Sequence, residues 1–99
     1  MNILIDNRLF EWDDEKAEIN YKKHGVTFDT AAKVFGDENR IEEYDEWHSI
    51  DEERWQVIGM VAKIIFVVYT ERGDFTRLIS AREATPRERR KYYARKENY

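Results

Sequence analysis

Hydrophobic and polar positions in the first third of the chain predict two helices. The first runs from an N-cap at Asp13 to a stop at Gly25, and Ala17, Ile19 and Tyr21 give it a modest apolar face. The second begins near Asp29 and is closed by a glycine, with apolar residues near helical spacing at Phe28, Ala31, Ala32 and Phe35. We therefore expect a helix pair ahead of the first strand.

From residue 40 the pattern changes to that of strands. Residues 40–44 fit an edge strand and 45–51 a polar loop, and residues 54–60 alternate well enough for a second strand. Residues 62–70 are rich in β-branched and aromatic side chains, which predicts a central strand covered on both faces. A tight hairpin at 71–74, with Gly73 available for positive φ, leads into an antiparallel partner at 75–81.

Strict alternation in this last strand places residues 75, 77, 79 and 81 on one face and residues 76, 78, 80 and 82 on the other. Thr85-Pro86-Arg87-Glu88 then carries a strong helix-start signal. Thr85 caps the N-terminus of the helix, Pro86 occupies the first helical position, and Glu88 stands three residues after the cap. A terminal helix begins there, and it bears many lysines and arginines with Tyr92 and Tyr93 between them.

Composition limits this architecture to one domain, 1–99. With 99 residues, 41% hydrophobic and 38% charged, the chain has material for one small core beneath a heavily charged surface. It lacks cysteine, so neither disulfides nor thiolate zinc ligands contribute. The longest apolar run, 64–69, is far shorter than the roughly 20 residues of a membrane helix, and no signal peptide is evident. We expect a cytoplasmic protein.

The net charge of −4 hides a division along the chain. Residues 1–53 hold 16 acidic and 6 basic residues, whereas residues 54–99 hold 5 acidic and 11 basic residues. Such a division is compatible with ordinary surface patterning. It also fits a basic half that meets phosphate and an acidic half that meets another partner.

The chain also carries a long series of spaced residues that resembles one known family. The first half contains Phe10-Glu11-Trp12-Asp13, Lys16-Ala17, Asn20, Lys23-His24-Gly25-Val26, Phe28, Ala31-Ala32 and Val34-Phe35. The second half contains Glu53-Arg54-Trp55, Ile58-Gly59, Val67-Val68, Thr70, Arg72-Gly73, Arg77, Ile79-Ser80-Ala81-Arg82, Ala84-Thr85 and Glu88-Arg89. In order and spacing these residues resemble the BrnT-type toxins from Phe10 to about Tyr92.

The resemblance implies an α+β fold of the RelE-like kind, in which two N-terminal helices and a C-terminal helix pack on an antiparallel sheet of about four strands. It implies an endoribonuclease toxin of a type II toxin–antitoxin system that arrests growth. It further implies a BrnA-type antitoxin, a ribbon-helix-helix protein through which alone the toxin would meet operator DNA. The first nine residues, the acidic run 42–46 and the tail after Tyr93 are less typical of the family.

Metal-independent RNA cleavage needs cations for the phosphate and groups that move protons. Arg54, Arg72, Arg77 and Arg82 come from neighbouring predicted strands and their turn, so several can converge on one sheet face. Arginine holds two phosphate oxygens and stays charged, and we favour Arg82 and Arg54 as phosphate clamps. The alternative for each is an ion pair with Glu53, Glu71 or Glu83.

Four further residues are candidates for catalysis, each with a structural alternative. An imidazole can serve as acid or base near neutral pH, so His24 is a candidate for proton transfer, but it also fits as a cap at a helix end. Lys23 is either a phosphate contact or a helix-end charge. Glu53 is a general base or an orienting partner of Arg54. Tyr92 is a catalytic tyrosine, as the resemblance suggests, or packs on the sheet.

Arg72, Arg77, Arg89 and Lys22 complete the predicted RNA contacts, and His48 either stacks on a base or is simply exposed. The acidic run 42–46 has no dependable metal spacing, so we expect no metal or other cofactor. Two further interpretations stay open: a non-catalytic nucleic-acid-binding module, and a regulatory subunit that only binds an antitoxin.

Overall fold

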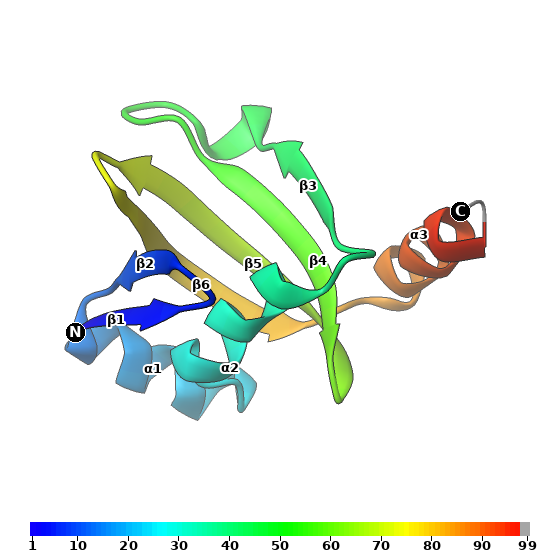
Figure 1. Ribbon diagram of the computed structural model, residues 1–99, viewed down its shortest axis with the longest axis horizontal. Coiled ribbons are helices and arrows are strands. Elements are labelled where there is room, and N and C mark those ends of the chain that lie inside the picture. The colour runs from blue at the N-terminus through cyan, green and yellow to red at the C-terminus, as the bar shows by residue number, and fades with distance from the viewer. Residues whose placement is uncertain (98–99) are drawn as a thin grey trace.

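The computed structural model describes residues 1–97 and contains one six-stranded sheet (Figure 1). The strands are β1 (Asn2–Ile5), β2 (Arg8–Glu11), β3 (Ile41–Tyr44), β4 (Trp55–Val61), β5 (Lys63–Arg72) and β6 (Phe75–Glu83). Their order is β1-β2-β6-β5-β4-β3, and every neighbouring pair is antiparallel except β2 and β6, which run parallel. The α+β class is therefore confirmed, but the expectation of about four antiparallel strands was wrong.

The two additional strands form a hairpin in the first eleven residues. Asp6 and Asn7 occupy its turn with positive φ values of 50° and 65°, a conformation that Asp and Asn tolerate better than other non-glycine residues. β2 then lies beside β6, with Leu9 opposite Phe75 and Glu11 opposite Arg77. Asp6-Asn7 between two apolar segments was the signal for this hairpin in the sequence.

The first predicted helix, α1 (Asp14–His24), is confirmed at both ends. The Asp13 carboxylate accepts a hydrogen bond from the Lys16 N–H at 3.1 Å, and Gly25 closes the helix at φ 71°. The second helix, α2 (Phe28–Lys33), continues as a short 3-10 turn, η1 (Val34–Gly36). It starts slightly before the predicted position because Thr27, whose hydroxyl accepts from the Thr30 N–H, is the cap.

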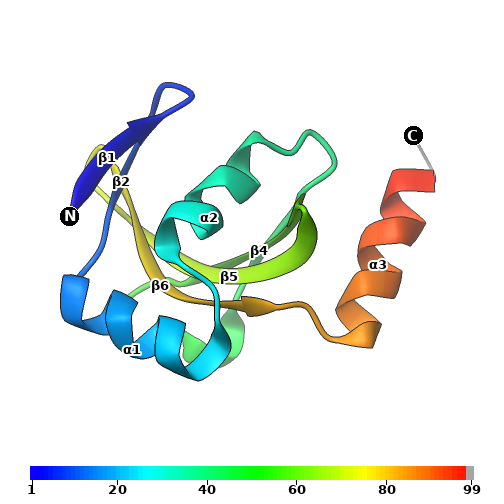
Figure 2. The same cartoon turned by 90° about the horizontal axis from the view of Figure 1, so that it is seen from below.

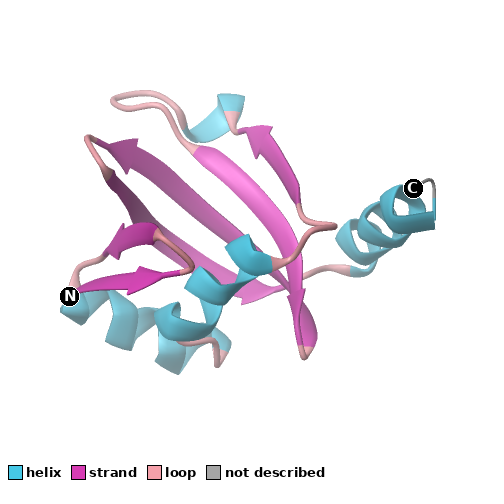
Figure 3. Cartoon of the chain, viewed as in Figure 1, coloured by secondary structure: helices cyan, strands magenta, loops and turns pink. Residues whose placement is uncertain are grey.

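The helices surround the sheet unequally. α1 contacts β6 and α2 packs across β6 and β5, whereas α3 (Pro86–Glu97) lies apart from both at the other end of the sheet (Figure 2). The main core lies under α2 and η1, where the ring of Phe35 contacts those of Phe10 and Tyr69 at centroid distances of 5.3 and 4.9 Å. A smaller cluster beneath α3 contains Ile58, Ile64, Ala84 and Tyr92. Figure 3 shows the strands as one continuous layer between these helices.

Asn20 on α1 completes the edge of β6. β2 pairs with β6 only as far as Arg77, so the later residues of β6 have no strand on that side. The buried Asn20 amide donates to the Ala81 carbonyl at 2.8 Å and accepts from the Ala81 N–H at 3.1 Å. One side chain thereby satisfies two backbone groups that burial would otherwise leave unpaired.

A β-bulge in β6 overturns the predicted alternation. Tyr69 lies opposite Leu78, but the next residue of β5, Val68, lies opposite Ser80, so β6 has one extra residue at Ile79. Leu78 and Ala81 are consequently both buried in the core. The prediction that residues 79 and 81 share one face, and that residue 78 shares the other with residues 80 and 82, was therefore wrong, although Ser80 and Arg82 do lie on one face.

The remaining elements agree with the predictions to within a few residues. The loop at 45–51 contains a short 3-10 turn, η2 (Glu46–His48), and β6 extends to Glu83. β5 lies at the centre of the sheet as expected, yet only one of its faces is fully covered. Phe66 and Val68 on the second face are half-buried. Within residues 1–97, no helix has the length and apolar character needed to cross a membrane.

Candidate functional site

The sheet face that α1 and α2 leave open holds two adjoining depressions, which share Gln56, Phe66 and Glu88 and are called the groove below. One has a volume of about 410 Å³ and the other about 390 Å³. Asp45, Arg54, Gln56, Phe66, Val68, Ile79, Ser80, Arg82 and Glu88 line the first. Glu43, Gln56, Ile58, Phe66, Thr85, Arg87, Glu88 and Lys91 line the second.

Strand register explains why these side chains meet. Val68 lies opposite Gln56 on one side and Ser80 on the other, while Phe66 lies opposite Arg82. Directly opposed residues in a sheet project to the same face, so both rows point into the groove. The extra residue at Ile79 is what places Arg82 on this face together with Ser80.

The guanidinium of Arg82 is held from several sides. Its Nη1 and Nη2 donate to the two carboxylate oxygens of Glu88 at 2.8 and 3.0 Å, and Nη1 also donates to the Glu83 carbonyl at 3.2 Å. Its central carbon lies 4.2 Å from the centre of the Phe66 ring. Within the described residues, the Nε–H and one Nη2–H have no acceptor. These two donors form the side edge of the fork, which matches two oxygens of a phosphate.

Glu88 combines this contact with the predicted capping box. Its carboxylate accepts from the Thr85 N–H at 2.9 Å, and its own N–H donates to the Thr85 hydroxyl at 3.2 Å. Burial raises the pKa of this carboxyl, but hydrogen bonds from Arg82 and Thr85 outweigh burial, and the pKa lies below its usual value. Glu88 is therefore ionised at neutral pH and serves as a fixed anchor for Arg82.

Arg54 enters the groove from the segment just before β4. Its N–H donates to the Ser49 hydroxyl at 2.9 Å and its carbonyl accepts from the Asp45 N–H at 2.8 Å, so its backbone is anchored to the loop that follows β3. Its Nε is buried and makes no hydrogen bond within the described residues. The structure thus brings Arg54 and Arg82, the two favoured phosphate clamps, into one depression.

The two walls of the groove differ in charge. The α3 wall carries Arg87 and Lys91, whereas the β3 wall carries Glu43 and the buried Asp45. An ion pair between Lys91 and Glu43 joins the two walls. Among the side chains that the structure describes, which do not include those of His48 and Glu97, no cluster of three or more His, Asp or Glu residues is arranged to hold a metal ion.

The other arginines and lysine predicted to bind RNA lie outside the groove lining. Arg72 pairs with Glu52 at 3.3 Å, Arg77 with Glu11 at 3.4 Å and Lys22 with Glu18 at 3.1 Å. Arg89 donates to the Ala84 carbonyl at 3.2 Å. Ion pairing was the predicted alternative for the sheet arginines, and Arg72, Arg77 and Arg82 do each pair with a carboxylate. Their partners are Glu52, Glu11 and Glu88, and none of these is among the predicted Glu53, Glu71 and Glu83.

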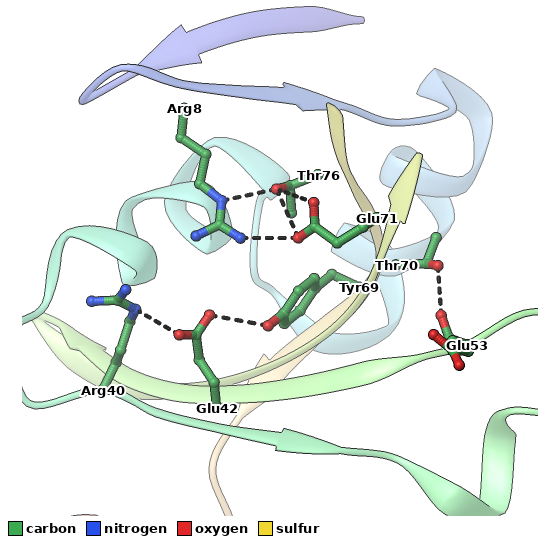
Figure 4. A network of polar contacts seen from close by, with 8 residues as sticks. All are labelled: Arg8, Arg40, Glu42, Glu53, Tyr69, Thr70, Glu71 and Thr76. Carbon is green, nitrogen blue, oxygen red and sulfur yellow. Dashed lines mark hydrogen bonds and ion pairs between the residues drawn. The ribbon is translucent and has the colours of Figure 1, made fainter. Parts of the chain in front are cut away.

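The predicted proton-transfer residues are not gathered around Arg54 and Arg82. His24 lines a separate pocket of about 250 Å³, which also includes Lys63 and Glu83. Lys23 is exposed on α1. Glu53 is also exposed, and its carbonyl accepts a hydrogen bond from the Thr70 hydroxyl at 2.6 Å (Figure 4). The side chain of His48 lies outside the described residues.

Tyr92 packs beneath α3 and does not line the groove. Its side chain is only 1% exposed, and its hydroxyl donates to the Asp37 carboxylate at 2.5 Å. Burial, together with the hydrogen bond and charge of Asp37, raises its pKa far above the usual value. Tyr92 therefore keeps its proton and connects α3 to the segment that follows η1.

A second polar network lies on the opposite, core side of the sheet (Figure 4). Arg8 donates to Thr76 at 2.8 Å and to Glu71 at 3.0 Å, and it stacks on Phe35 at 4.3 Å. In the same figure the Tyr69 hydroxyl donates to Glu42, which also pairs with Arg40. Each arginine here has a carboxylate partner, so this network links strands to one another.

Gln56, Ser80, Asp45 and Glu88 are groove residues that the sequence reasoning did not select. Gln56 is a polar residue inside an otherwise apolar strand, and this was the signal available for it, whereas Ser80 lies in a strand of mixed polarity that gave no such signal. Glu88 was recognised only as part of the capping box. Its second role depends on the position of Arg82 in space, which no local pattern records.

Comparison with known proteins decides the family. Residues 12–88 match the family model described as the ribonuclease toxin, BrnT, of type II toxin-antitoxin systems. The chain belongs to the BrnT family. The crystal structure of the Brucella abortus ribonuclease toxin BrnT superimposes with a TM-score of 0.59 and 25% identity, covering 77% of this chain and 95% of that one. A search of curated proteins finds no match.

Membership of the BrnT family confirms the resemblance found in the sequence and the role of a toxin in a type II toxin–antitoxin system. The match to the BrnT family model includes Arg54, Arg82 and Glu88 and ends before Tyr92. These three residues of the first depression therefore lie inside the part of the chain that matches the BrnT model.

Proposed function

We propose that this BrnT-family chain is a metal-independent, cytoplasmic endoribonuclease that arrests growth by cleaving RNA in the groove. The observation that carries the proposal is the presence of Arg54 and Arg82 in one depression on an open sheet face. Two guanidinium groups beside one phosphate match the need of a reaction in which a phosphodiester gains negative charge.

In this mechanism the ribose 2′-oxygen attacks the adjacent phosphorus while its proton passes to water. The bond to the 5′-oxygen breaks as that oxygen takes a proton from water, which leaves a 2′,3′-cyclic phosphate and a 5′-hydroxyl. The free side edge of Arg82 donates two hydrogen bonds to phosphate oxygens, and Arg54 neutralises the additional charge of the transition state. Glu88 holds Arg82 before the RNA arrives, which removes the cost of orienting a flexible side chain during the reaction.

The charge of the groove walls indicates how RNA approaches. Arg87 and Lys91 line the α3 side, and further basic residues of the same helix extend this cationic surface. The acidic β3 side repels phosphate. We therefore place the RNA backbone along α3, with one phosphate reaching Arg82.

The test is to incubate antitoxin-free protein with naked RNA in EDTA and follow the fragments on a gel. Arg82→Ala and Arg54→Ala should each slow cleavage about a hundredfold, the loss typical for one stabilising donor. Lys33→Ala is the matched control, because Lys33 is exposed on α2, away from the α3 wall, and lines neither depression. Absence of fragments with the wild type, or full activity in both folded groove variants, overturns the proposal.

A non-catalytic RNA-binding or antitoxin-binding role is the second candidate. It is favoured by the lining of the groove, which among the described residues includes no histidine or tyrosine to move a proton. A gel-shift assay with the same RNA separates the two candidates. Binding that is lost in Arg82→Ala, without any fragments from the wild type, supports the second candidate.

We also propose that a BrnA-type ribbon-helix-helix antitoxin neutralises this toxin and links it to operator DNA. Membership of a type II toxin family supports an antitoxin partner in general. An adjacent reading frame that encodes a small ribbon-helix-helix protein, and copurification of its product with this chain, is the expected result. A neighbouring partner of another fold would contradict the assignment to BrnA.

A further inference from the structure

The segment that ends β3 and follows it carries an unusual set of exposed apolar side chains. Trp47 and Ile50 are 88% and 87% exposed, and Tyr44 is 43% exposed. The other two tryptophans, Trp12 and Trp55, are buried or half-buried. A tryptophan side chain presents up to about 250 Å² of contact area, so leaving it in water forgoes a large hydrophobic gain. Tyr44, Trp47 and Ile50, with β3 itself, are called the β3 surface below.

Acidic residues flank these apolar side chains along the chain. Between residues 41 and 53 the chain has seven Asp or Glu residues and no Lys or Arg. Arg40, Lys91 and Arg72 pair with Glu42, Glu43 and Glu52. Within the part of the chain that the structure describes, Glu46, Asp51 and Glu53 form no ion pair. The β3 surface therefore combines exposed apolar side chains with an excess of negative charge.

The backbone offers a third recognition element. β3 is the end strand of the sheet, and no described strand pairs with its outer side (Figure 1). Its outward N–H and C=O groups form a row onto which an extended segment can be added. The acidic side chains discourage a second copy of this chain from pairing there, because like charges would face one another.

We propose that the β3 surface docks a cationic, extended segment of a partner protein, which pairs with β3 and covers Trp47 and Ile50 with apolar side chains. Charge complementarity selects this occupant, since RNA and anionic lipid would be repelled by the same carboxylates. The docked segment lies at the rim of the groove, because Glu43 and Asp45 also line the groove. The proposal concerns protein binding and does not depend on RNA cleavage.

A designed peptide provides the test. The probe is a ten-residue peptide of alternating valine and arginine, titrated into the full-length protein at low salt while tryptophan emission is recorded. Burial of Trp47 should shift the emission to shorter wavelength with saturation. Ile50→Ser should weaken binding about tenfold, as expected for an interface anchor. Raising the salt concentration should weaken binding of the peptide to the wild-type protein, because the acidic residues near Trp47 and Ile50 attract the arginines of the peptide less strongly in salt.

Four controls decide the outcome. Trp47→Phe should abolish the emission shift, whereas Ile19→Ser, at a residue 57% exposed on α1, should leave binding unchanged. A peptide with glutamate in place of arginine should not bind. The same arginine peptide with alternate backbone nitrogens methylated should also fail, since it cannot pair with β3.

The proposal is overturned if the arginine peptide produces no saturable shift or if Ile50→Ser binds as tightly as the wild type. It is also overturned if a single-stranded RNA of ten nucleotides shifts Trp47 emission more strongly than the peptide, because the surface then recognises nucleic acid. None of these readouts measures cleavage, so failure of the nuclease proposal would leave them unaffected.

Discussion

Glu88 holds Arg82 through two hydrogen bonds of 2.8 and 3.0 Å while its carboxylate also caps α3. The start of α3 and the orientation of the groove arginine therefore depend on one side chain. A carboxylate with two oxygens can serve a guanidinium and a backbone N–H at once. An amide in its place has only one acceptor oxygen for both.

Glu88→Gln should lower the rate of RNA cleavage about tenfold while leaving Arg82 present and charged. The physical reason is that an arginine no longer fixed by two charge-assisted bonds must be oriented during the reaction. The measurement is single-turnover cleavage beside Glu83→Gln as control, since the Glu83 side chain lies outside the groove. Equal rates for wild type and Glu88→Gln would exclude a positioning role.

The lowered pKa of Glu88 also predicts how stability depends on pH. Its folded pKa lies below the unfolded value of 4.5, so its contribution is present above that value and is lost as pH falls through the folded pKa. Wild type should exceed Glu88→Gln in free energy of unfolding at pH 7, by about 1 kcal/mol after solvent screening. The difference should shrink on acidification below pH 4.5 in urea titrations. A difference that grows in acid would contradict this assignment.

Tyr92→Phe should destabilise the protein by about 1–3 kcal/mol, because it removes the hydrogen bond to Asp37 and leaves a carboxylate less well satisfied. Cleavage per folded molecule should stay within a fewfold of wild type, since Tyr92 does not line the groove. Thermal unfolding and RNA cleavage together check this. Severe loss of activity with unchanged stability would restore Tyr92 as a catalytic residue.

Asn20→Leu should lower the free energy of unfolding by about 2–4 kcal/mol, because the buried N–H and C=O groups of Ala81 would both lose their hydrogen-bond partner. Asn20→Asp is informative as a second variant: it can still accept from the N–H but turns a negative charge toward the carbonyl. Chemical denaturation should give both variants a lower free energy of unfolding than the wild type. Ile19→Ser, on an exposed position of the same helix, serves as the control.

Gly59→Ala should destabilise by about 1–3 kcal/mol, as overpacking does in a close-packed core. A methyl group there would lie 2.6 Å from Val34 Cγ1 and 3.2 Å from the Val34 carbonyl oxygen. Gly25→Ala is a useful contrast, because its Cβ would meet no atom within 4 Å and its cost arises only from φ 71°. For Gly59→Ala, differential scanning calorimetry should show a lower unfolding temperature and a smaller unfolding enthalpy than for the wild type.

Local signals in the sequence predicted the helices well. Asp13, Gly25 and the Thr85-Pro86-Arg87-Glu88 segment each act over a few residues, so the helix ends and the capping box follow from neighbouring residues alone. The hairpin of β1 and β2 was missed, although Asp6-Asn7 signalled its turn. Its parallel pairing with β6 joins residues more than sixty positions apart, and no local pattern encodes such a pairing.

The groove was predictable only in part. Sequence reasoning selected Arg54 and Arg82, and strand register brings them together. It also proposed His24, Glu53 and Tyr92, which the fold distributes to other places. The error has a physical source, because residue type states what a side chain can do, whereas the pairing of strands and one bulge decide what it faces.

The bulge at Ile79 gives β6 one residue more than its pairing with β5 requires. Loss of a single residue at this point would restore a regular ladder and keep Ser80, Ala81 and Arg82 on their present faces. Gain of a second residue would place two residues between Leu78 and Ser80, and regular alternation would again leave Ser80 and Arg82 on the groove face, but their pairing with β5 would slip by two positions. A deletion here would therefore be tolerated better than an insertion, because only the deletion keeps both the faces and the register of β6.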